Sequence, residues 1–443
     1  MKKFYTLLTV LLCLAAVTAN AQKYVGGDIS LLTQYETHGA KYYDTDKKTA
    51  ITDLLSYFKS KGMNTMRVRL FVNPDNATAA EKDQGVCQDL EYVKALGKRI
   101  KDAGFKLMVD FHYSDTWADP GKQWTPKDWL TLSDKELQEK IYTYTKESLQ
   151  ALKDAGAEPD FIQTGNEISY GMLWGEGIIT KNTDETTEYQ KSSSTYKNVY
   201  AGNTTGNYSA NWNRFVALLK KAGTACREVC PNAKIIIHTE RVERPSYMST
   251  YYQTLKNDGV DYDIMGLSYY SYYHGNLSTL NSALITLEND LPDKDIMIVE
   301  MAYFHKWQPS TITGNYDLSS IYPITDEGQK QYTEALINVL NNHSKVKGLF
   351  WWWMEGNECG LDWNTNRVTR SWCNYSLFDN EAGYAMPAIN SLRSFLGEVS
   401  GVETVETTQV TTDYKWYTVN GQHISKPTQQ GIYINNRKKI AVK

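Results

Sequence analysis

The feature that most limits the fold is a repeated alternation of short apolar stretches with longer amphipathic ones. Apolar runs of this length that end at polar residues are typical of strands buried in a parallel sheet. The expected strands are Val25–Ile29, Thr65–Leu70, Lys106–Phe111, Phe161–Gly165, Lys234–Thr239, Ile264–Leu267, Ile296–Val299 and Lys347–Phe350. The helical patterns between them are Ile51–Lys61, Leu90–Ala103, Ser133–Asp154, Trp212–Cys230, Leu277–Asn289 and Asp326–Asn341. This alternation predicts an α/β fold, a (β/α)8 TIM barrel, and 443 residues are enough for such a barrel with insertions.

Residues that start and stop helices support this assignment. Ser133 and Glu136 have the spacing of a capping box, in which each side chain accepts a hydrogen bond from the other residue's backbone N–H. Gly62, Gly104 and Gly156 come just after three of the helical patterns, where glycine commonly takes the left-handed conformation that ends a helix. The helix boundaries are therefore expected near these residues.

Two carboxylates stand at the ends of two expected strands. The stretch Asp160–Glu167 is largely apolar until it closes on Asn166 and Glu167, and Ile296–Glu300 is apolar until Glu300. Barrel enzymes place their chemistry at the carboxyl ends of the strands. A glycosidase needs a pair of carboxylic acids on either side of the bond that it cuts. The two strand ends therefore predict a glycosidase site.

Other polar residues follow the second and third expected strands. In Met66–Leu70 the alternation of side chains along a strand points Arg67 and Arg69 to one face. Arg69 is nearer the carboxyl end and is the expected site residue. The segment His112–Gly121 follows the third strand and is dense in His, Asp and Trp, which is typical of a binding loop. Polar groups at the ends of nearly all strands favour a closed barrel over an open sheet.

Aromatic residues gather after the sixth and eighth expected strands. Tyr269 and Tyr270 are followed by Tyr272–His274, and the eighth strand runs into Trp351–Trp353. The chain holds 32 Tyr and 12 Trp, and flat amphipathic rings at a surface stack on sugar faces. Alternation sends about half of the rings in a strand toward the helices, so core packing is the competing interpretation for each of them.

The first residues have the layout of a secretory signal peptide. Met1–Lys3 is basic, Leu7–Val17 is apolar, and Ala19–Ala21 places small residues before a cleavage site ahead of Gln22. The protein is therefore expected to be exported to the periplasm, the cell surface or the medium. No other stretch is apolar for the ~20 residues of a membrane helix, so no membrane span is expected.

Net charge and cysteines constrain the partners and the cross-links. A formal net charge of −4 gives no reason to expect nucleic acid as a partner. The cysteines after the signal segment show no zinc-type spacing. Cys226 and Cys230 lie one turn apart on an expected helix, which is a poor geometry for a disulfide, whereas Cys359 and Cys373 are candidates for a loop disulfide.

The composition changes after about Gly397, where a Val- and Thr-rich segment precedes two strand-like runs, Trp416–Gln422 and Gly431–Asn435. Asn420 and Gly421 between strand-like runs are a hairpin signal. This small C-terminal β tail resembles the short tails of many exported bacterial enzymes, some of which serve secretion. The expected division is a signal peptide at 1–21, a catalytic barrel at 22–397, and the β tail at 398–443 as a candidate sorting module.

Several longer motifs identify a family resemblance. They are Gly27–Ser30, Phe111–Gln123, Gly165–Ile168, Gly266–Tyr270 and Val299–Glu300. The chain resembles the endo-β-1,4-galactanases of glycoside hydrolase family 53, retaining (β/α)8 enzymes that attack the galactan side chains of pectin. The resemblance covers Tyr24 to about Phe395. An Asn-Glu pair alone would be a weak signal, whereas the long loop after the third strand is a strong one.

The resemblance implies that Glu167 is the general acid and base and that Glu300 is the nucleophile. A retaining enzyme needs these two carboxyl groups ~5 to 5.5 Å apart. Glu167 must start protonated, so its pKa should lie above that of Glu300, which Arg69 and nearby hydroxyls are expected to keep ionised. Asn166 is expected to bind the sugar 2-hydroxyl, a contact that strengthens in the transition state.

The expected ligand is a β-1,4-galactan polysaccharide or oligosaccharide, bound by a monomer without a cofactor. Some relatives bind calcium in the loop after the seventh strand, but Phe304–Ser310 lacks the closely spaced Asp, His and Asn of that site, so no metal is expected. The expected substrate-binding residues are Arg69, Asn166, His112, Asp115, Trp117, Tyr269, Tyr273, His274, Trp352 and Trp353.

Two alternatives compete with a galactanase. An enzyme of the same clan that acts on mannan, xylan or glucan would keep both glutamates, and only the loop Phe111–Gln123 disfavours it. A non-catalytic sugar-binding protein would keep the aromatic residues but would need neither carboxylate. The 4-oxygen of galactose is axial, so a galactan chain bends and requires a curved cleft. Rings at several strand ends predict such a cleft, open at both ends and therefore suited to endo attack.

Overall fold

The computed structural model describes residues 22–174, 177–181, 187–191, 208–306, 316–362, 364–369 and 374–397, and four short strands between residues 416 and 442. The chain divides into two compact units, Met1–Glu398 and Val399–Lys443. The expected signal peptide at 1–21 lies outside the described residues. So do Cys373 of the candidate disulfide, the Asn420-Gly421 turn, and residues 307–310 of the loop considered for calcium.

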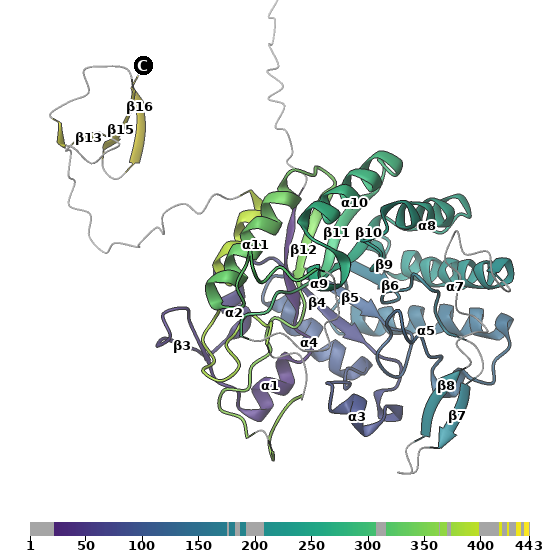
Figure 1. Ribbon diagram of the computed structural model, residues 1–443. Coiled ribbons are helices and arrows are strands. Elements are labelled where there is room, and N and C mark those ends of the chain that lie inside the picture. Colours follow the sequence, from purple (N-terminus) through teal and green to yellow (C-terminus); the bar gives the residue numbers. More distant parts are fainter. Residues whose placement is uncertain are drawn as a thin grey trace, which may run out of the picture. The chain divides into compact units, whose positions relative to one another are not determined.

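The first unit is built on a closed parallel barrel of eight strands (Figure 1), so the fold prediction is confirmed. Around the barrel the order is β1-β12-β11-β10-β9-β6-β5-β4, and β1 pairs with both β4 and β12 to close it. The strands are β1 (Tyr24–Asp28), β4 (Thr65–Leu70), β5 (Lys106–Phe111), β6 (Phe161–Thr164), β9 (Lys234–Thr239), β10 (Ile264–Tyr269), β11 (Asp295–Met301) and β12 (Val346–Trp351). Each lies within two residues of its predicted bounds.

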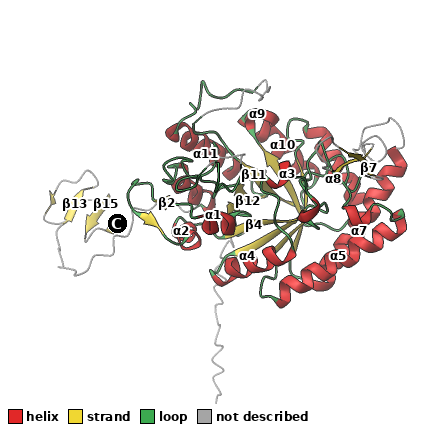
Figure 2. Cartoon of the chain, turned by 90° about the horizontal axis from the view of Figure 1, so that it is seen from below, coloured by secondary structure: helices red, strands yellow, loops and turns green. Residues whose placement is uncertain are grey.

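Helices surround the barrel, as the view from below shows (Figure 2). The longer ones are α1 (Leu32–His38), α2 (Leu54–Ser60), α4 (Leu90–Asp102), α5 (Asp134–Asp154), α7 (Tyr208–Val229), α8 (Pro245–Asn257), α10 (Leu277–Asp290) and α11 (Asp326–Asn341). The shorter ones are α3 (Ala79–Lys82), α9 (Ser271–His274) and α12 (Ala388–Ser391), and the helical turns are η1 (Pro74–Asn76), η2 (Lys127–Trp129) and η3 (Leu392–Leu396). Helices α1 and α8 are not among the predicted helical patterns, whereas the longer helices that follow them, α2 and α10, are.

The predicted helix signals are present in the structure. Ser133 caps α5, and both hydrogen bonds of its capping box with Glu136 are formed. Gly62, Gly104 and Gly156 have φ angles of 88°, 78° and 79° and follow α2, α4 and α5. Glycine is favoured there because the left-handed region costs other residues free energy.

Two two-stranded ribbons and a separate sheet complete the described chain. The ribbons are β2 (Tyr42–Tyr43) with β3 (Ala50–Ile51), and β7 (Gly177–Lys181) with β8 (Thr187–Lys191). The second unit is an antiparallel sheet in the order β14-β13-β15-β16, at the position of the expected β tail. Its strands are β13 (Trp416–Thr418), β14 (His423–Ile424), β15 (Gly431–Asn435) and β16 (Lys438–Val442). Among the described helices, none is both long and apolar enough for a membrane crossing.

The interior of the barrel has an apolar layer below a polar one. The apolar layer is a buried cluster of Met108, Phe161, Ile236, Ile264, Met297, Val299 and Phe350. Side chains two residues apart on a strand share a face, so the next inward positions lie one step nearer the carboxyl ends. On β5, β6 and β9 these positions hold Asp110, Gln163 and His238, all fully buried. The apolar layer closes the bottom of the barrel, and polar chemistry is confined to the carboxyl ends.

Closure of the barrel depends on one glycine. A Cβ atom built on Gly26 of β1 would lie 1.7 Å from the carbonyl oxygen of Thr65 on β4. We therefore expect Gly26→Ala to force β1 away from β4 and to lower the free energy of unfolding by about 1–3 kcal/mol or more. Chemical denaturation followed by circular dichroism measures this change.

Gly223→Ala is the matched control. Gly223 lies within α7, and the nearest atom to its added Cβ would be 3.6 Å away, an ordinary contact distance. Alanine is the better helix former, so this variant should be neutral or more stable by about 0.5–1 kcal/mol. An unchanged unfolding free energy for Gly26→Ala would contradict the close approach of the two strands.

Candidate active site

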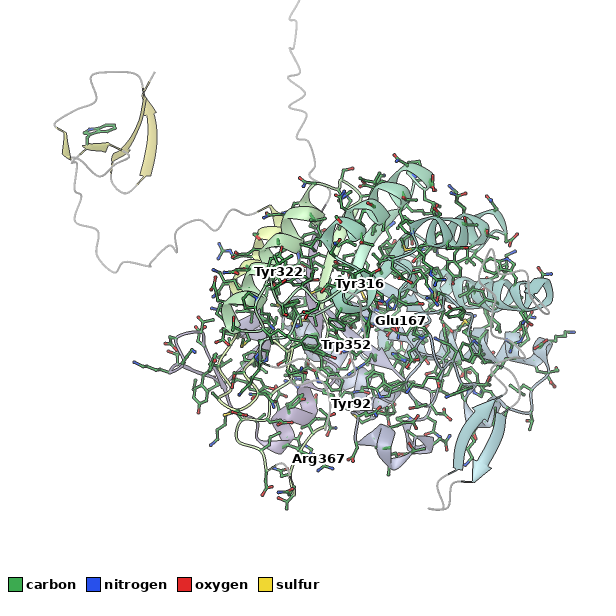
Figure 3. The ribbon with its side chains drawn as sticks, in the orientation of Figure 1. Tyr92, Glu167, Tyr316, Tyr322, Trp352 and Arg367 are labelled. Atoms are coloured by element: carbon green, nitrogen blue, oxygen red, sulfur yellow. The ribbon has the colours of Figure 1, made fainter. Side chains whose placement is uncertain are left out.

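A cavity with a volume of about 470 Å³ lies over the carboxyl ends of the barrel strands. Seven of the residues predicted for the site line it, namely Trp117, Asn166, Glu167, Tyr273, His274, Glu300 and Trp352. Figure 3 labels Glu167 and Trp352, which lie in the central part of the first unit. The remaining lining residues are Gln84, Ala118, Asp119, Pro120, Lys122, Glu240, Arg241, Glu243, Tyr270 and Tyr272. The two predicted catalytic carboxylates thus share one cavity.

The floor of this cavity is organised by Arg67 of β4, which is fully buried. Its guanidinium donates to Asp28 at 3.0 Å, to Asp110 at 2.7 Å and to Gln163 at 3.0 Å, and it pairs with Glu300 at 2.9 Å. These partners belong to β1, β5, β6 and β11. Burial lowers the pKa of Arg67, but the surrounding carboxylates raise it by more. The net shift is upward, so this side chain stays charged.

The prediction that Arg69 lies beside Glu300 is wrong, since Arg67 occupies that place. Both arginines point into the barrel, but Arg67 lies at the level of the polar layer and Arg69 lies one step above it. Arg69 is instead buried among indole rings, and its Cζ lies 4.6 Å from the ring centroid of Trp117, 4.9 Å from that of Trp352 and 5.0 Å from that of Trp353. Alternation along a strand predicts which side chains lie on the same face of the sheet. It does not predict how far along the barrel axis each of them lies.

Glu300 reaches the interior because of a β-bulge in β11. In the pairing of β10 with β11, Leu267 aligns with Ile298 but Ser268 aligns with Glu300, so Val299 is skipped. A bulge of this kind turns the following side chain to the other face of the strand. Glu300 therefore lies beside Ser268, whose side chain also points into the barrel.

Three neighbours act on the Glu300 carboxylate. Its Oε1 pairs with Arg67, and its Oε2 accepts hydrogen bonds from the hydroxyls of Tyr270 at 2.9 Å and Ser268 at 3.3 Å. Burial raises the pKa of Glu300 and outweighs Arg67 and the Tyr270 hydroxyl, which lower it, so that the pKa is about 7. These two partners thus favour the ionised carboxylate against the cost of its burial.

The backbone at Glu167 is held in an unusual conformation. Gly165 and Glu167 have φ angles of 109° and 48°, and the second is left-handed although the residue is not glycine. Such a conformation costs a side chain on the order of 1 kcal/mol or more and is typical of active sites. The carbonyl of Asn166 accepts from Gln123 at 2.7 Å, and the N–H of Glu167 donates to His238 at 3.3 Å. Side chains from two other elements therefore fix this turn.

The environment of Glu167 favours its protonated form. Burial raises its pKa well above the ordinary value, the carboxylates of Glu300 and Glu240 raise it further, and the Ser268 hydroxyl lowers it. No cation among the described residues pairs with Glu167, whereas Arg67 pairs with Glu300. The pKa of Glu167 therefore lies above that of Glu300, in the order that the sequence analysis expected.

Asn166 is fixed at both ends of its amide. Its Oδ1 accepts from Arg67 at 3.0 Å and lies 3.0 Å from Nδ1 of His238, and its Nδ2 donates to the carbonyl of Ala118 at 2.8 Å. An amide nitrogen carries two hydrogens. One N–H of Asn166 therefore remains for a ligand in the cavity.

Two predicted binding residues hold the loop after β5 rather than line the cavity. His112 is buried, its Nδ1 accepts from the N–H of Ala118 at 3.1 Å, and its Nε2 lies 3.1 Å from Asp110. Asp115 is also buried, and it accepts from the backbone N–H groups of Asn73 and Lys127 and from the side chain of Asn76. Substrate contact was therefore wrongly predicted for both. Polar residues that are frequent in a loop can stabilise the conformation of the loop instead of binding a ligand.

Two predicted rings face away from the cavity. Tyr269 is fully buried and its hydroxyl donates to the carbonyl of Gly275 at 2.9 Å, while the next residue, Tyr270, lines the cavity. Trp353 is also fully buried, its φ angle is 52°, and it packs edge-to-face against Trp352, which lines the cavity. Alternation explains the first case, and a left-handed residue that interrupts alternation explains the second.

Several lining residues were missed in the sequence. Tyr270 was part of a predicted motif, but its neighbour was chosen. Glu240, Arg241 and Glu243 follow directly on the apolar strand β9. That is the same signal that identified Glu167, a polar residue where an apolar run stops. Among the described residues, no group of three or more His, Cys, Asp and Glu side chains is arranged to hold a metal ion.

Comparison with known proteins links this site to carbohydrate hydrolysis. Residues 24–392 match the family described as "Glycosyl hydrolase family 53". An "Endo-beta-1,4-galactanase" of Bacillus subtilis (strain 168) is 30% identical over 332 residues, which cover 74% of this chain and 68% of the relative. An "Arabinogalactan endo-beta-1,4-galactanase" of Cellvibrio japonicus (strain Ueda107) is 30% identical over 404 residues, which cover 87% of this chain and 96% of the relative.

A solved structure gives the same picture. The "Ignisphaera aggregans GH53 catalytic domain" superposes with a TM-score of 0.69 and is 30% identical in sequence. The superposition covers 84% of this chain and 96% of that one. The similarity therefore includes the whole of the related catalytic domain.

Proposed function

The chain belongs to glycosyl hydrolase family 53, and we propose on that premise that it is a retaining endo-β-1,4-galactanase acting by double displacement. One observation carries the proposal. Glu167 and Glu300 line the same cavity, and the Ser268 hydroxyl interacts with both carboxyl groups. A retaining glycosidase needs two carboxyl groups close together, one neutral and one ionised. Arg67 pairs with Glu300, whereas no cation among the described residues pairs with Glu167. This favours an ionised Glu300 and a neutral Glu167.

In the first step, a carboxylate oxygen of Glu300 attacks the anomeric carbon of the galactosyl unit. The bond between that carbon and the glycosidic oxygen breaks, and Glu167 gives its proton to the leaving oxygen. Negative charge leaves Glu300 as the covalent bond forms, while Glu167 becomes a carboxylate. Arg67 holds Glu300 ionised before this step and compensates its charge within a buried layer.

In the second step, the roles of the two carboxyl groups reverse. Glu167, now ionised, takes a proton from a water molecule, which attacks the anomeric carbon as the bond to Glu300 breaks. Two inversions at the same carbon leave the product with the starting anomeric configuration. The pKa order of the two groups suits this cycle, because Glu167 is neutral at the start and Glu300 is the better-stabilised anion.

The sugar under attack has donors and rings within reach. The free N–H of Asn166 is available for the 2-hydroxyl, where a contact strengthens as the oxocarbenium-like state forms. Trp117 and Trp352 line the cavity and are packed against the guanidinium of Arg69, which limits their movement. Rings fixed at different angles suit a bent β-1,4-galactan chain better than a flat ribbon.

We also propose that the protein is exported and acts as a monomer. Export rests on the signal-like residues 1–21. The monomer rests on the composition of the cavity, because one chain supplies both carboxylates, the cation and the aromatic rings.

The acidic limb of the pH profile should depend on Tyr270. Its hydroxyl lowers the pKa of Glu300, so Tyr270→Phe should raise that pKa. Because Glu300 must be ionised, activity is lost as the pH falls through its pKa, and the variant should lose it at a higher pH. We expect the acidic limb of kcat/KM to move by roughly 0.5 to 1 pH unit, about 1 kcal/mol of lost stabilisation.

Tyr269→Phe is the control, since its hydroxyl bonds a backbone carbonyl and not a catalytic carboxyl. Its pH profile should match that of the wild type. Equal shifts in the two variants would show that the hydroxyl of Tyr270 has no specific effect on Glu300.

The substrate and the mode of attack are tested by a product profile. The purified protein should cut β-1,4-galactan at least about 100-fold faster than mannan, xylan or cellulose, because donors aimed at an axial oxygen are left unpaired by an equatorial one. Viscosity should fall before much reducing sugar appears, with short oligosaccharides as early products. Comparable rates on mannan would contradict the galactan assignment, and release of monosaccharide from the first minutes would contradict endo attack.

A further inference from the structure

The segment directly after β9 places Glu240, Arg241 and Glu243 in the wall of the cavity. The proposed mechanism uses none of them. Glu240 is 5% exposed, which is unusual for a carboxyl group outside the catalytic pair. A buried polar atom without a hydrogen-bond partner in the protein is a candidate for ligand contact. The hydrogen bonds of the Glu240 carboxyl group are therefore informative.

Within the part of the chain that the structure describes, one oxygen of Glu240 has partners and the other has none. Its Oε1 accepts from the Ser169 hydroxyl at 2.5 Å and pairs with Nε of Arg241 at 3.0 Å. Its Oε2 is buried and has no hydrogen-bond partner among the described residues. Ser169 lies two residues after Glu167, so the turn that carries the acid also orients Glu240. The carboxyl group is thus held by one oxygen and presents the other.

Arg241 braces a second carboxyl group in the same way. Its guanidinium stacks on the ring of Tyr170, with Cζ 4.3 Å from the centroid, and its Nη1 lies 3.5 Å from Oε1 of Glu243. Oε2 of Glu243 is also buried, and none of the described residues forms a hydrogen bond with it. Two acceptor oxygens, on Glu240 and Glu243, are therefore fixed around one cation.

His274 adds a donor to this wall. Burial and, to a smaller extent, the charge of Arg241 lower its pKa to about 3, so the ring is neutral. Its Nδ1 accepts from the N–H of Tyr270 at 3.1 Å, which leaves the ring proton on Nε2. A wall with two acceptors and one donor matches the hydroxyls of a sugar, which both donate and accept.

The position of the wall indicates which sugar it meets. β9 pairs with β6, the strand that ends at Glu167, whereas Glu300 and Arg67 belong to β11 and β4. The charge of Glu240 also acts on Glu167. An acid must lie beside the glycosidic oxygen that it protonates. The wall next to the acid therefore faces the part of the substrate that leaves.

We propose that Glu240 and Glu243, braced by Arg241, bind hydroxyls of the galactosyl unit on the leaving-group side of the scissile bond. This inference rests on the proposed galactanase function and adds a specificity site to it. The same wall holds an incoming sugar when a hydroxyl replaces water in the second step. In that transfer the sugar oxygen bonds to the anomeric carbon, its proton goes to Glu167, and the bond to Glu300 breaks.

The test compares two leaving groups at the pH at which the wild type is most active, where Glu300 is ionised and Glu167 is protonated. One substrate is β-1,4-galactan, and the other is 2,4-dinitrophenyl β-galactobioside, whose leaving group carries no hydroxyls and needs no proton. Glu240→Gln and Glu243→Gln should each lower kcat/KM on galactan about 10-fold and change it less than about twofold on the aryl substrate. Glu228→Gln is the control, because Glu228 pairs with Lys146 on the helical surface.

A second measurement separates sugar binding from tuning of the acid. With added galactobiose as acceptor, the aryl substrate gives transfer and hydrolysis products from the same intermediate. The ratio of transfer to hydrolysis should fall about 10-fold in both variants. An unchanged ratio would overturn the proposal, as would equal losses on both substrates or no loss on galactan. Failure of the wild type to cut galactan would instead overturn the proposed function itself.

Glu243→Gln also keeps the test valid if Glu240→Gln does not fold. Glu243 is partly exposed, so its replacement disturbs the core less than replacement of Glu240. Both variants should keep the thermal unfolding temperature of the wild type within a few degrees. If only Glu240→Gln unfolds, the loss on galactan and the transfer ratio of Glu243→Gln decide the proposal.

Discussion

The buried guanidinium of Arg67 is the interaction on which the site depends. It joins β4 to four other strands, and its partners are the carboxylates of Asp28, Asp110 and Glu300 and the side-chain amide of Gln163. Removal of a buried cation leaves its carboxylates uncompensated, which typically costs on the order of 3–5 kcal/mol. Loss of Arg67 would therefore destabilise the whole polar layer. Below it, apolar side chains fill the barrel and keep this layer at the carboxyl ends.

The same cation also gives the two proposed catalytic carboxyl groups different electrostatic environments. Burial raises the pKa of both, and Arg67 acts on Glu300 alone through an ion pair. A difference in environment thus separates the pKa values of two chemically identical side chains, as the proposed acid and nucleophile require. The strained turn at Glu167 and the bulge before Glu300 bring the two groups to the same cavity. Backbone irregularities at the strand ends are therefore part of the catalytic arrangement.

Much of the fold could be predicted from the sequence, because apolar strands and amphipathic helices alternate with a clear period. The two glutamates that share the cavity could be located for the same reason, since each follows an apolar strand stretch. The choice of Arg69 over Arg67 failed because the height of a residue in a barrel depends on strand stagger. Stagger is set by pairing between strands far apart in the sequence, and one strand alone does not reveal it.

Local backbone features account for the other differences. The bulge at Val299 arises from the pairing of β10 with β11, and no residue type in the strand signals it. The left-handed φ of Trp353 turns the third tryptophan of a run away from the cavity, although the preceding residue, Trp352, lines it. Glu240 was visible in the sequence, because it follows the apolar strand β9 as Glu167 follows β6.

The account makes Glu300 the nucleophile because Arg67 keeps it ionised in a buried layer. The most direct measurement is to trap the covalent intermediate with 2,4-dinitrophenyl 2-deoxy-2-fluoro-β-galactobioside. Fluorine slows hydrolysis of the intermediate while the good leaving group lets it form. Proteolysis and mass spectrometry then locate the attached sugar. We predict one label per chain, on the peptide that contains Glu300. A label on Glu167 or Glu240, or none while the unmodified substrate is turned over, would contradict this assignment.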